Sequence, residues 1–503
     1  MNKQENSADQ PLLQRIAAAR TPEGTLPPGF ALPKEKTLNR LVFADGALDG
    51  IKLYHTEIKP VPITELTEAL QQLCHGQQQE GDRRIDAFLK QHAMIEVIDD
   101  LQKWIAAHRS QLDPGALSRY AIGCLMTSSL PEMVKLGLAL MEMMNTDGQP
   151  QLKQIVRTLA LSDELTLFCL FVMRNWSHAN DEMFDLVQKV RGWGRIHCVA
   201  QIEPENRLIR KWLLDYGCEN TVAAAYSALP VAEKAELAEQ LAKEDISDQD
   251  WQGINRIVDG LMAEGPVAGI SSYSKKEELL ERYPQQAARR QTRTLTEVRN
   301  LIAIMQYIQR EKKEYPALKQ KLTELLQSSA SYLAVSEAME LGNGFEEAVK
   351  LGIPYAQKAM DWLKQDPIEH CMTVRWLMLS EPDVDAILAI FRQALPLSQM
   401  ASGPSDVLGL GKEYQSYHAL AALVQALAAY PGQGTEFLQC ALLCPVVSCR
   451  THALNTLEGW VNLSAAPLKG IAPQLMPVLA QAEVLEVKEE LRNRILRLKE
   501  KEA

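Results

Sequence analysis

The sequence lacks the features that mark membrane, secreted and nucleic-acid-binding proteins. Its 503 residues contain no apolar run long enough to span a bilayer, and the N-terminal segment has no apolar stretch of signal-peptide length. Basic residues number 53 against 64 acidic ones, which gives a formal net charge of −11. Because phosphate backbones attract Lys and Arg, this balance argues against general nucleic-acid binding. We therefore expect a cytoplasmic protein that binds no membrane.

Motifs of the common enzyme classes are also missing. Gly409-Leu-Gly411-Lys412 lacks the further glycine and the Lys-Ser/Thr pair of a phosphate-binding loop, and no dinucleotide fingerprint opens a strand–helix unit. Neither H-E-x-x-H nor G-x-S-x-G occurs. No loop typical of Cys-ligated haem and no nucleotide-binding pattern for flavin is present. We therefore expect no cofactor, and a binding protein more than an enzyme.

The cysteines do not form a disulfide framework. There are nine, an odd number without regular spacing, in a long chain. Six of them lie in apolar helical contexts: Cys74, Cys124, Cys169, Cys198, Cys218 and Cys371. This pattern indicates reduced thiols that act as small core residues in a cytosolic protein.

What the sequence does contain is helical periodicity. Hydrophobic residues make up 46% of the chain but aromatic residues only 6%, and runs rich in β-branched residues are scarce. Segments with the 3.6-residue period succeed one another from residue 63. The first seven are expected at about 64–78, 82–93, 94–108, 115–128, 131–145, 150–160 and 163–175. The spacing is near that of helical hairpins of ~40 residues, so we predict an all-α fold of stacked hairpins.

The pattern divides the chain into five regions. Residues 1–37 are polar and rich in proline, which predicts a flexible arm. Residues 38–62 predict a small β-hairpin, with strands at Arg40–Ala44 and Ile51–Ile58 around two Asp-Gly turn signals. Residues 63–230 are expected to form a first helical block, 231–330 a charged helical connector that is exposed over residues 274–324, and 331–503 a second helical block.

The most informative stretch runs from Val187 to Asn220. Apolar residues at helical spacing predict one helix up to Ile202, and Pro204 then opens a second helix that Gly217 ends in a left-handed conformation. The short link makes the two helices antiparallel neighbours. Part of the stretch recurs near the C-terminus, as the pattern Arg-x-His-x-apolar-x-x-apolar-Glu. The two copies begin at Arg195 and Arg450, and such self-similarity indicates a repeat architecture.

The second copy resembles a known repeat. Val447-Ser-Cys-Arg450-Thr-His-Ala453-Leu454-Asn-Thr-Leu457 is similar to the second helix of a HEAT-type unit, and Pro382-Asp383 before Ile387–Phe391 resembles the turn and inner helix of another. The resemblance covers about half of the chain and implies a HEAT-like α-solenoid, a superhelix whose concave face binds partners. The phrase GRIH…EPE…IR.WLL..GC.N is also similar to bacterial chains labelled limonene hydroxylase. That label implies an oxygenase, which no motif supports.

The twin motif is the first candidate site. Arg195, His197 and Glu203, with Arg450, His452 and Glu458 in the second copy, could each form an acid–base or binding cluster. However, residues two apart on a helix point to different sides, so Arg and His do not share a face. The structural alternative is that each arginine pairs with a carboxylate of the neighbouring repeat or caps its carbonyl groups.

The second candidate is a set of soft ligands. Cys440, Cys444, Cys449 and His452 could hold zinc or an iron–sulfur cluster. No C-x₂-C pair is present, and Pro445 would have to bend the chain between two ligands. The alternative is that these cysteines are core residues of a helical repeat.

The third candidate is the basic segment around Arg289, Arg290 and Arg293. It could form a groove for anions or a nucleic-acid backbone. Acidic residues such as Glu297 and Glu311 lie among these arginines, so the alternative is a solvated helix with ion pairs.

Taken together, the sequence predicts a non-enzymatic scaffold or adaptor that binds a protein partner along the concave face of a helical-repeat superhelix. An enzyme of unknown chemistry and a helical-repeat protein that binds nucleic acid are the alternatives.

Overall fold

The computed structural model describes residues 10–33, 43–57, 59–265 and 267–500, and this part of the chain is all-helical. It contains thirty α-helices and five short 3₁₀ helices, and pairing between extended segments is limited to one isolated bridge, Val407 with Val446. The all-α prediction is confirmed. Across the same residues, none of the helices is both long and apolar enough to cross a membrane.

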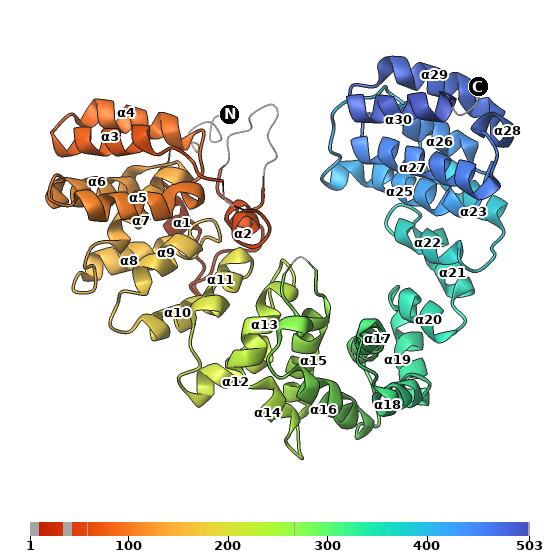
Figure 1. Ribbon diagram of the computed structural model, residues 1–503, viewed down its shortest axis with the longest axis horizontal. Coiled ribbons are helices and arrows are strands. Elements are labelled where there is room, and N and C mark those ends of the chain that lie inside the picture. Colours follow the sequence, from red (N-terminus) through yellow and green to blue (C-terminus); the bar gives the residue numbers. More distant parts are fainter. Residues whose placement is uncertain (1–9, 34–42, 58, 266, 501–503) are drawn as a thin grey trace. The chain divides into compact units, whose positions relative to one another are not determined.

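Two compact units make up the chain (Figure 1). Unit 1 comprises the described residues of Met1–Arg289 and Asn300–Lys319, and unit 2 those of Arg290–Arg299 and Gln320–Ala503. Helices α17 (Leu295–Arg310) and α18 (Pro316–Leu326) contribute residues to both. The other helices of unit 1 are α1 (Leu12–Ala19), α2 (Ala47–Tyr54), α3 (Thr64–Cys74), α4 (Gln78–Leu89), α5 (Met94–His108), α6 (Pro114–Thr127), α7 (Pro131–Glu142), α8 (Pro150–Leu159), α9 (Thr166–Met173), α10 (Ala179–Val187), α11 (Trp193–Gln201), α12 (Arg207–Tyr216), α13 (Ala225–Lys234), α14 (Leu237–Leu241), α15 (Asp248–Met262), η1 (Ile270–Ser272) and α16 (Lys276–Ala288).

The helices of unit 2 are shorter on average and are separated by several single turns. They are α19 (Ser329–Glu340), α20 (Phe345–Leu351), α21 (Ala356–Gln365), η2 (Cys371–Thr373), α22 (Val374–Leu377), α23 (Val384–Ala394), α24 (Leu397–Met400), η3 (Lys412–Tyr414), α25 (Gln415–Ala426), η4 (Leu427–Ala429), α26 (Thr435–Leu442), α27 (Val447–Ser464), α28 (Leu468–Ile471), η5 (Pro473–Leu475), α29 (Met476–Leu485) and α30 (Glu489–Glu500).

The seven helices expected between residues 64 and 175 are α3 to α9. Local sequence signals place their starts: Pro114, Pro131 and Pro150 each occupy the first turn of a helix, where the missing N–H has no intrahelical partner to lose. Asp113 caps α6 by accepting the N–H of Gly115 at 2.9 Å. Helices close in sequence then pack together, with α3 on α4, α6 on α7 and α7 on α9. Hydrophobic periodicity therefore located this region correctly.

Part of the segment expected to be a flexible arm is an ordered helix. Helix α1 packs against α6 and α8, and its residues Leu12 and Ile16 are fully buried. The N–H of Leu12 donates to the carbonyl of Ser128 at 2.9 Å. Two apolar side chains one turn apart are enough to dock this short helix, and the proline-rich composition around it hid that signal.

The predicted β-hairpin is wrong where the structure describes it. The first strand falls mostly outside the described residues, and the second overlaps α2, which forms from Ala47 to Tyr54. The Asp-Gly pairs serve a different purpose. Gly46 has φ +73° and stands at the start of α2, and a Cβ on Gly50 would lie 2.3 Å from the Trp193 ring. These glycines let the helix approach an indole ring closely. An Asp-Gly pair with this role looks the same in the sequence as an Asp-Gly pair in a hairpin turn.

The stretch from Val187 to Asn220 differs from its prediction in three places. Helix α10 ends at Val187 and α11 begins at Trp193, so the apolar face spans two helices. Helix α12 begins at Arg207, where Asn206 accepts the N–H of Ile209 at 2.9 Å. Gly217 is right-handed, with φ −60° and ψ −28°. A side-chain cap at Asn206 thus replaced the proline as the start of the second helix.

The expected connector, residues 231–330, is not an exposed linker. Within residues 274–324, the part expected to be exposed, Tyr283, Leu301 and Leu322 are fully buried. Tyr283 donates to Asn255 Oδ1 at 2.6 Å, and Asn300 donates to Tyr283 Oη at 3.1 Å. Charge density misled the prediction because the charged side chains cover one side of helices that bury the other.

Candidate functional site

Arg195, the first residue of the twin motif, joins two consecutive helices. Its guanidinium donates to the carbonyl of Tyr216 at the end of α12, at 3.0 Å, and lies over the Trp212 ring at 5.0 Å. Burial lowers the pKa of Arg195 below its ordinary value. The residue thus satisfies a carbonyl at a helix end, where a cation is favourable, and adds a cation–π contact.

His197 lies in a separate, aromatic environment. Its side chain is buried, and its ring stacks against Tyr54 and Trp193, with centroids 6.5 Å and 6.1 Å away. Burial lowers the pKa of His197 to about 4, so the ring is neutral at pH 7. Arg195 and His197 therefore do not form the acid–base cluster that the motif suggested.

Arg450 has a related position in unit 2, with more contacts. Its guanidinium forms a two-pronged pair with the Glu486 carboxylate, at 2.8 Å and 3.1 Å, and both side chains are 1% exposed. It also donates to the carbonyls of Cys444, Pro445 and Ser405 at 3.0, 2.8 and 2.8 Å. The Arg450 side chain thereby connects three segments: the loop after α24, the residues just before α27, and the turn after α29.

The remaining members of the second copy point elsewhere. Glu458 pairs with Arg494 of α30 at 2.7 Å. His452 is partly exposed, and burial of its ring lowers its pKa. The arginines of both copies thus donate to carbonyl groups at the ends of neighbouring segments, which is the structural alternative for this motif.

The three C-terminal cysteines are buried thiols. Cys440, Cys444 and Cys449 donate to the carbonyls of Leu397, Val446 and Tyr417 at 3.4, 3.5 and 3.2 Å. Burial raises the pKa of Cys440 to about 12. Across the described residues, no group of three or more His, Cys, Asp and Glu side chains is arranged to hold a metal ion. These cysteines and His452 therefore do not form a ligand set there.

The basic segment is used to hold helix ends. Arg289 donates to the carbonyl of Glu244 at 3.2 Å. Arg293 donates to the carbonyl of Leu325 at 3.1 Å and to the hydroxyls of Ser328 and Ser331, both at 2.9 Å. Arg290 is also engaged by other groups of the protein. The guanidinium groups of Arg289 and Arg293 thus point towards backbone carbonyl groups of the protein.

The sequence reasoning overlooked a buried ionic cluster in unit 1. Lys135 of α7 is 0% exposed, and its Nζ lies 2.8 Å from Asp49, 2.9 Å from Glu132 and 2.8 Å from Glu164. Burial opposes the charge on Lys135, but the three carboxylates outweigh it and raise its pKa. Burial also raises the pKa of Asp49 to about 6. A single lysine in the apolar run of α7, three residues after a glutamate, was the available signal.

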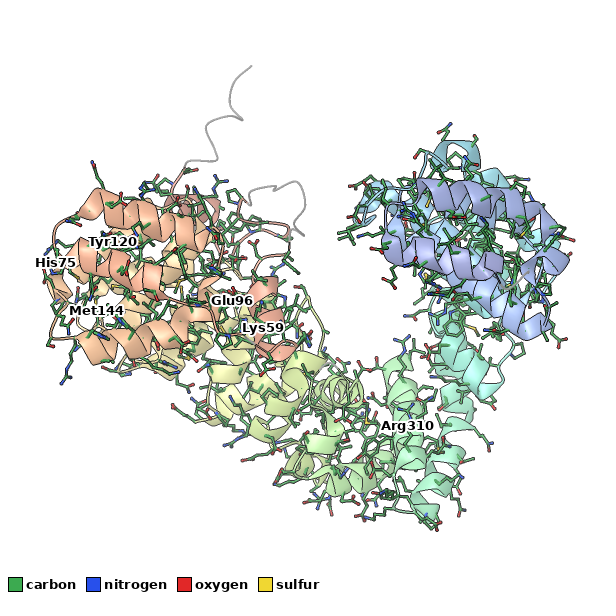
Figure 2. The ribbon with its side chains drawn as sticks, turned by 45° about the horizontal axis from the view of Figure 1, so that its top comes forward. Lys59, His75, Glu96, Tyr120, Met144 and Arg310 are labelled. Carbon is green, nitrogen blue, oxygen red and sulfur yellow. The ribbon has the colours of Figure 1, made fainter. Side chains whose placement is uncertain are left out.

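The cluster fastens α2 to the rest of unit 1. Glu164 Oε2 accepts the N–H of Gly46 at 2.9 Å, just before α2. At the other end, Lys52 pairs at 2.8 Å with Glu96 of α5, a residue labelled in Figure 2. Together these contacts hold α2, with Gly50, against Trp193.

A cavity of about 850 Å³ lies next to Trp193. Asp163 forms part of its wall, and its two carboxylate oxygens accept the N–H groups of Gly192 and Gly194, each at 3.1 Å. A Cβ on either glycine would come within 2.6 Å of that carboxylate, so the Gly-Trp-Gly sequence is required for this contact. Burial raises the pKa of Asp163 to about 6. The carboxylate caps α11 and shapes the wall beside it.

Comparison with known proteins identified no relative of this chain. Neither a family model, nor a curated protein, nor a solved structure matches the chain.

Proposed function

We propose that this protein is a non-enzymatic scaffold or adaptor that binds a protein partner, built as a HEAT-like helical-repeat chain and working in the cytoplasm. The packing of helices on their neighbours in sequence supports the repeat architecture. The nine free thiols, eight of them buried, support a reducing compartment. The observation that carries the proposal is an exposed apolar surface in unit 2.

This unit 2 apolar surface consists of Leu408, Leu410, Val484 and Val487. Their side chains are 51%, 66%, 78% and 57% exposed, which is unusual for large apolar residues. Leu408 and Leu410 lie on the loop after α24, and Val484 and Val487 on the end of α29 and the turn that follows it. Exposed apolar side chains on two such segments favour contact with another protein over contact with water.

Ionic contacts hold the two segments side by side. Asp406, two residues before Leu408, pairs at 2.6 Å with Lys488, the residue after Val487. The Nη2 of Arg450 donates both to the carbonyl of Ser405 and to the carboxylate of Glu486. The surface is therefore positioned before any partner arrives, which lowers the entropic cost of binding.

We assign to this surface an amphipathic helix of a partner protein, with basic residues beside its apolar face. An apolar helix face fits a surface of spaced leucine and valine side chains. Glu489 and Glu490 are exposed next to Val487, and the whole chain carries a formal charge of −11. Electrostatic complementarity therefore favours a positively charged partner.

The alternative functions have less support. For nucleic-acid binding, Arg289 and Arg293 would have to leave the carbonyl groups that they contact. For an enzyme, the residues of the twin motif would have to converge, and they are engaged in different helix contacts. The limonene hydroxylase label has no further support.

The test is affinity capture from the native host's lysate with three forms of the full chain. These are the wild type, a Leu408→Ser/Val487→Ser variant, and Leu341→Ser as a control that changes another exposed apolar residue, 81% exposed. We expect a protein that both wild type and control recover, that the double variant recovers at least tenfold less, and that binds the wild type directly once purified. Equal recovery by the double variant, or capture that disappears with nuclease, would contradict the proposal.

A further inference from the structure

The cavity beside Trp193 is large enough for a small organic molecule. Its volume of about 850 Å³ lies within the range of ligand pockets in proteins, roughly 300–1,000 Å³. Much of its wall is apolar and comes from segments far apart in the chain, including Pro27, Phe30, Phe43, Trp193 and Val222. Apolar walls of this kind bind the hydrocarbon or aromatic body of a ligand.

Most charged groups of the wall already have partners within the protein. Asp163 accepts two backbone N–H groups, and Asp45 accepts the N–H of Leu32 at 3.0 Å. Lys189 pairs with Asp185. These groups shape the cavity and are not available for a ligand without loss of an existing contact.

Arg191 and Ser162 are polar residues of the wall that remain available to a ligand. Arg191 lines the cavity and is exposed, and its guanidinium has no hydrogen-bond or ion-pair partner among the described residues. Ser162 also lines it, is 1% exposed, and its hydroxyl has no hydrogen-bond partner there either. A buried hydroxyl without a partner is destabilising, and a ligand that accepts its hydrogen bond would remove that cost.

The wall that carries these groups is rigid. The carbonyl of Arg191 accepts the N–H of Thr221 at 3.0 Å, and the next residue, Gly192, is held by Asp163. Trp193 is fixed in turn by its close contact with Gly50. The backbone at Arg191 and Gly192 is thus constrained, which fixes the point on the cavity wall from which the Arg191 side chain extends.

We propose that this cavity binds a small organic anion, with an aromatic or aliphatic body against the apolar wall and a carboxylate at Arg191. The carboxylate has two oxygens, which suit the two-pronged geometry of a guanidinium, and can also accept from Ser162. A cationic ligand would instead be repelled by the positive charge of Arg191. This site lies in unit 1 and does not depend on the proposed partner surface of unit 2.

Two dyes that differ chiefly in charge test the proposal on the full chain. 8-Anilinonaphthalene-1-sulfonate carries one sulfonate, and N-phenyl-1-naphthylamine has the same aromatic skeleton without it. We expect Arg191→Gln to weaken binding of the sulfonate at least tenfold and to change binding of the uncharged dye less than twofold. Ser162→Ala should weaken the sulfonate two- to fivefold. Arg109→Gln, which alters another exposed arginine of unit 1 outside the cavity, should change neither.

Further measurements locate the dye and identify the head group. Val222→Trp places a large ring at the exposed edge of the wall and should weaken both dyes. Sodium decanoate should displace the sulfonate dye, whereas decyltrimethylammonium should not. Equal affinity of wild type and Arg191→Gln for the sulfonate, binding insensitive to Val222→Trp, or absence of saturable binding would each overturn the proposal. Thermal unfolding of every variant checks that it is folded.

Discussion

Arg450 and Glu486 form a fully buried, two-pronged ion pair, with N–O distances of 2.8 Å and 3.1 Å. The remaining guanidinium hydrogens reach three carbonyl groups, so the arginine is satisfied on all sides. A buried pair of this kind adds little net stability over an apolar pair, but the loss of one partner is costly because the other charge remains buried.

Replacing Arg450 should therefore have a large effect on stability. We expect Arg450→Met to lower the free energy of unfolding by about 3–5 kcal/mol, because the buried Glu486 carboxylate then loses its buried ion-pair partner. Urea denaturation measures this value. The double variant Arg450→Met/Glu486→Gln should recover part of the loss, since it removes the uncompensated charge. A loss below about 0.5 kcal/mol in the single variant would contradict the assigned role.

The equivalent change in the first copy of the motif should be milder. Arg195 makes one hydrogen bond to a carbonyl and one cation–π contact. We expect Arg195→Ala to cost about 1–3 kcal/mol, measured by the same denaturation experiment. Arg191→Ala is the matched control, four residues earlier, and should leave stability within about 0.5 kcal/mol because its side chain has no partner among the described residues. Equal effects of the two changes would rule out a capping role for Arg195.

Gly50 tests the close approach of α2 to Trp193. A Cβ at this position would lie 2.3 Å from the ring, so we expect Gly50→Ala to destabilise the protein by about 1–3 kcal/mol. Gly123 of α6 provides the control, because a Cβ there meets nothing within 4 Å. Gly123→Ala should stabilise by about 0.5–1 kcal/mol, since alanine has less conformational freedom to lose in a helix. If the melting temperature shifts in the same direction in both variants, the contact between Gly50 and Trp193 is not tight.

His197 should make stability depend on pH. Burial lowers the pKa of His197 to about 4, below its ordinary value of 6.5, so the unfolded chain binds a proton more readily than the native protein. The associated stability is present above about pH 6.5 and is lost as the pH falls towards 4, by up to about 3 kcal/mol. We expect His197→Gln to lose less stability than the wild type between pH 7 and 4.5.

The comparison of the two pH profiles isolates this histidine. Asp49 and Asp163 have pKa values raised to about 6, so their contribution has the opposite sign: acidification favours the native state through them. That contribution is common to both proteins and cancels in the difference. Parallel profiles would contradict the buried, neutral state of His197.

Local signals predicted the helices well where each signal acts within one turn. Hydrophobic spacing and proline at the first turn located α3 to α9, because burial of one helix face requires that spacing whatever the partner is. The same signals failed at α2. The Asp-Gly pairs there serve a contact with Trp193, about 140 residues later in the chain, and local turn chemistry contains no information about that contact.

The candidate sites show the same division between local and distant information. Periodicity and composition were enough to predict that the chain is helical, that most of its thiols are core residues, and that arginines recur at related helical positions, because these features depend on near neighbours. Three facts required the packed structure: what those arginines contact, that the buried Lys135 has three carboxylates around it, and that Arg191 has no side-chain partner among the described residues. The energy of a buried charge depends on groups brought in from distant segments, and their positions are set by packing.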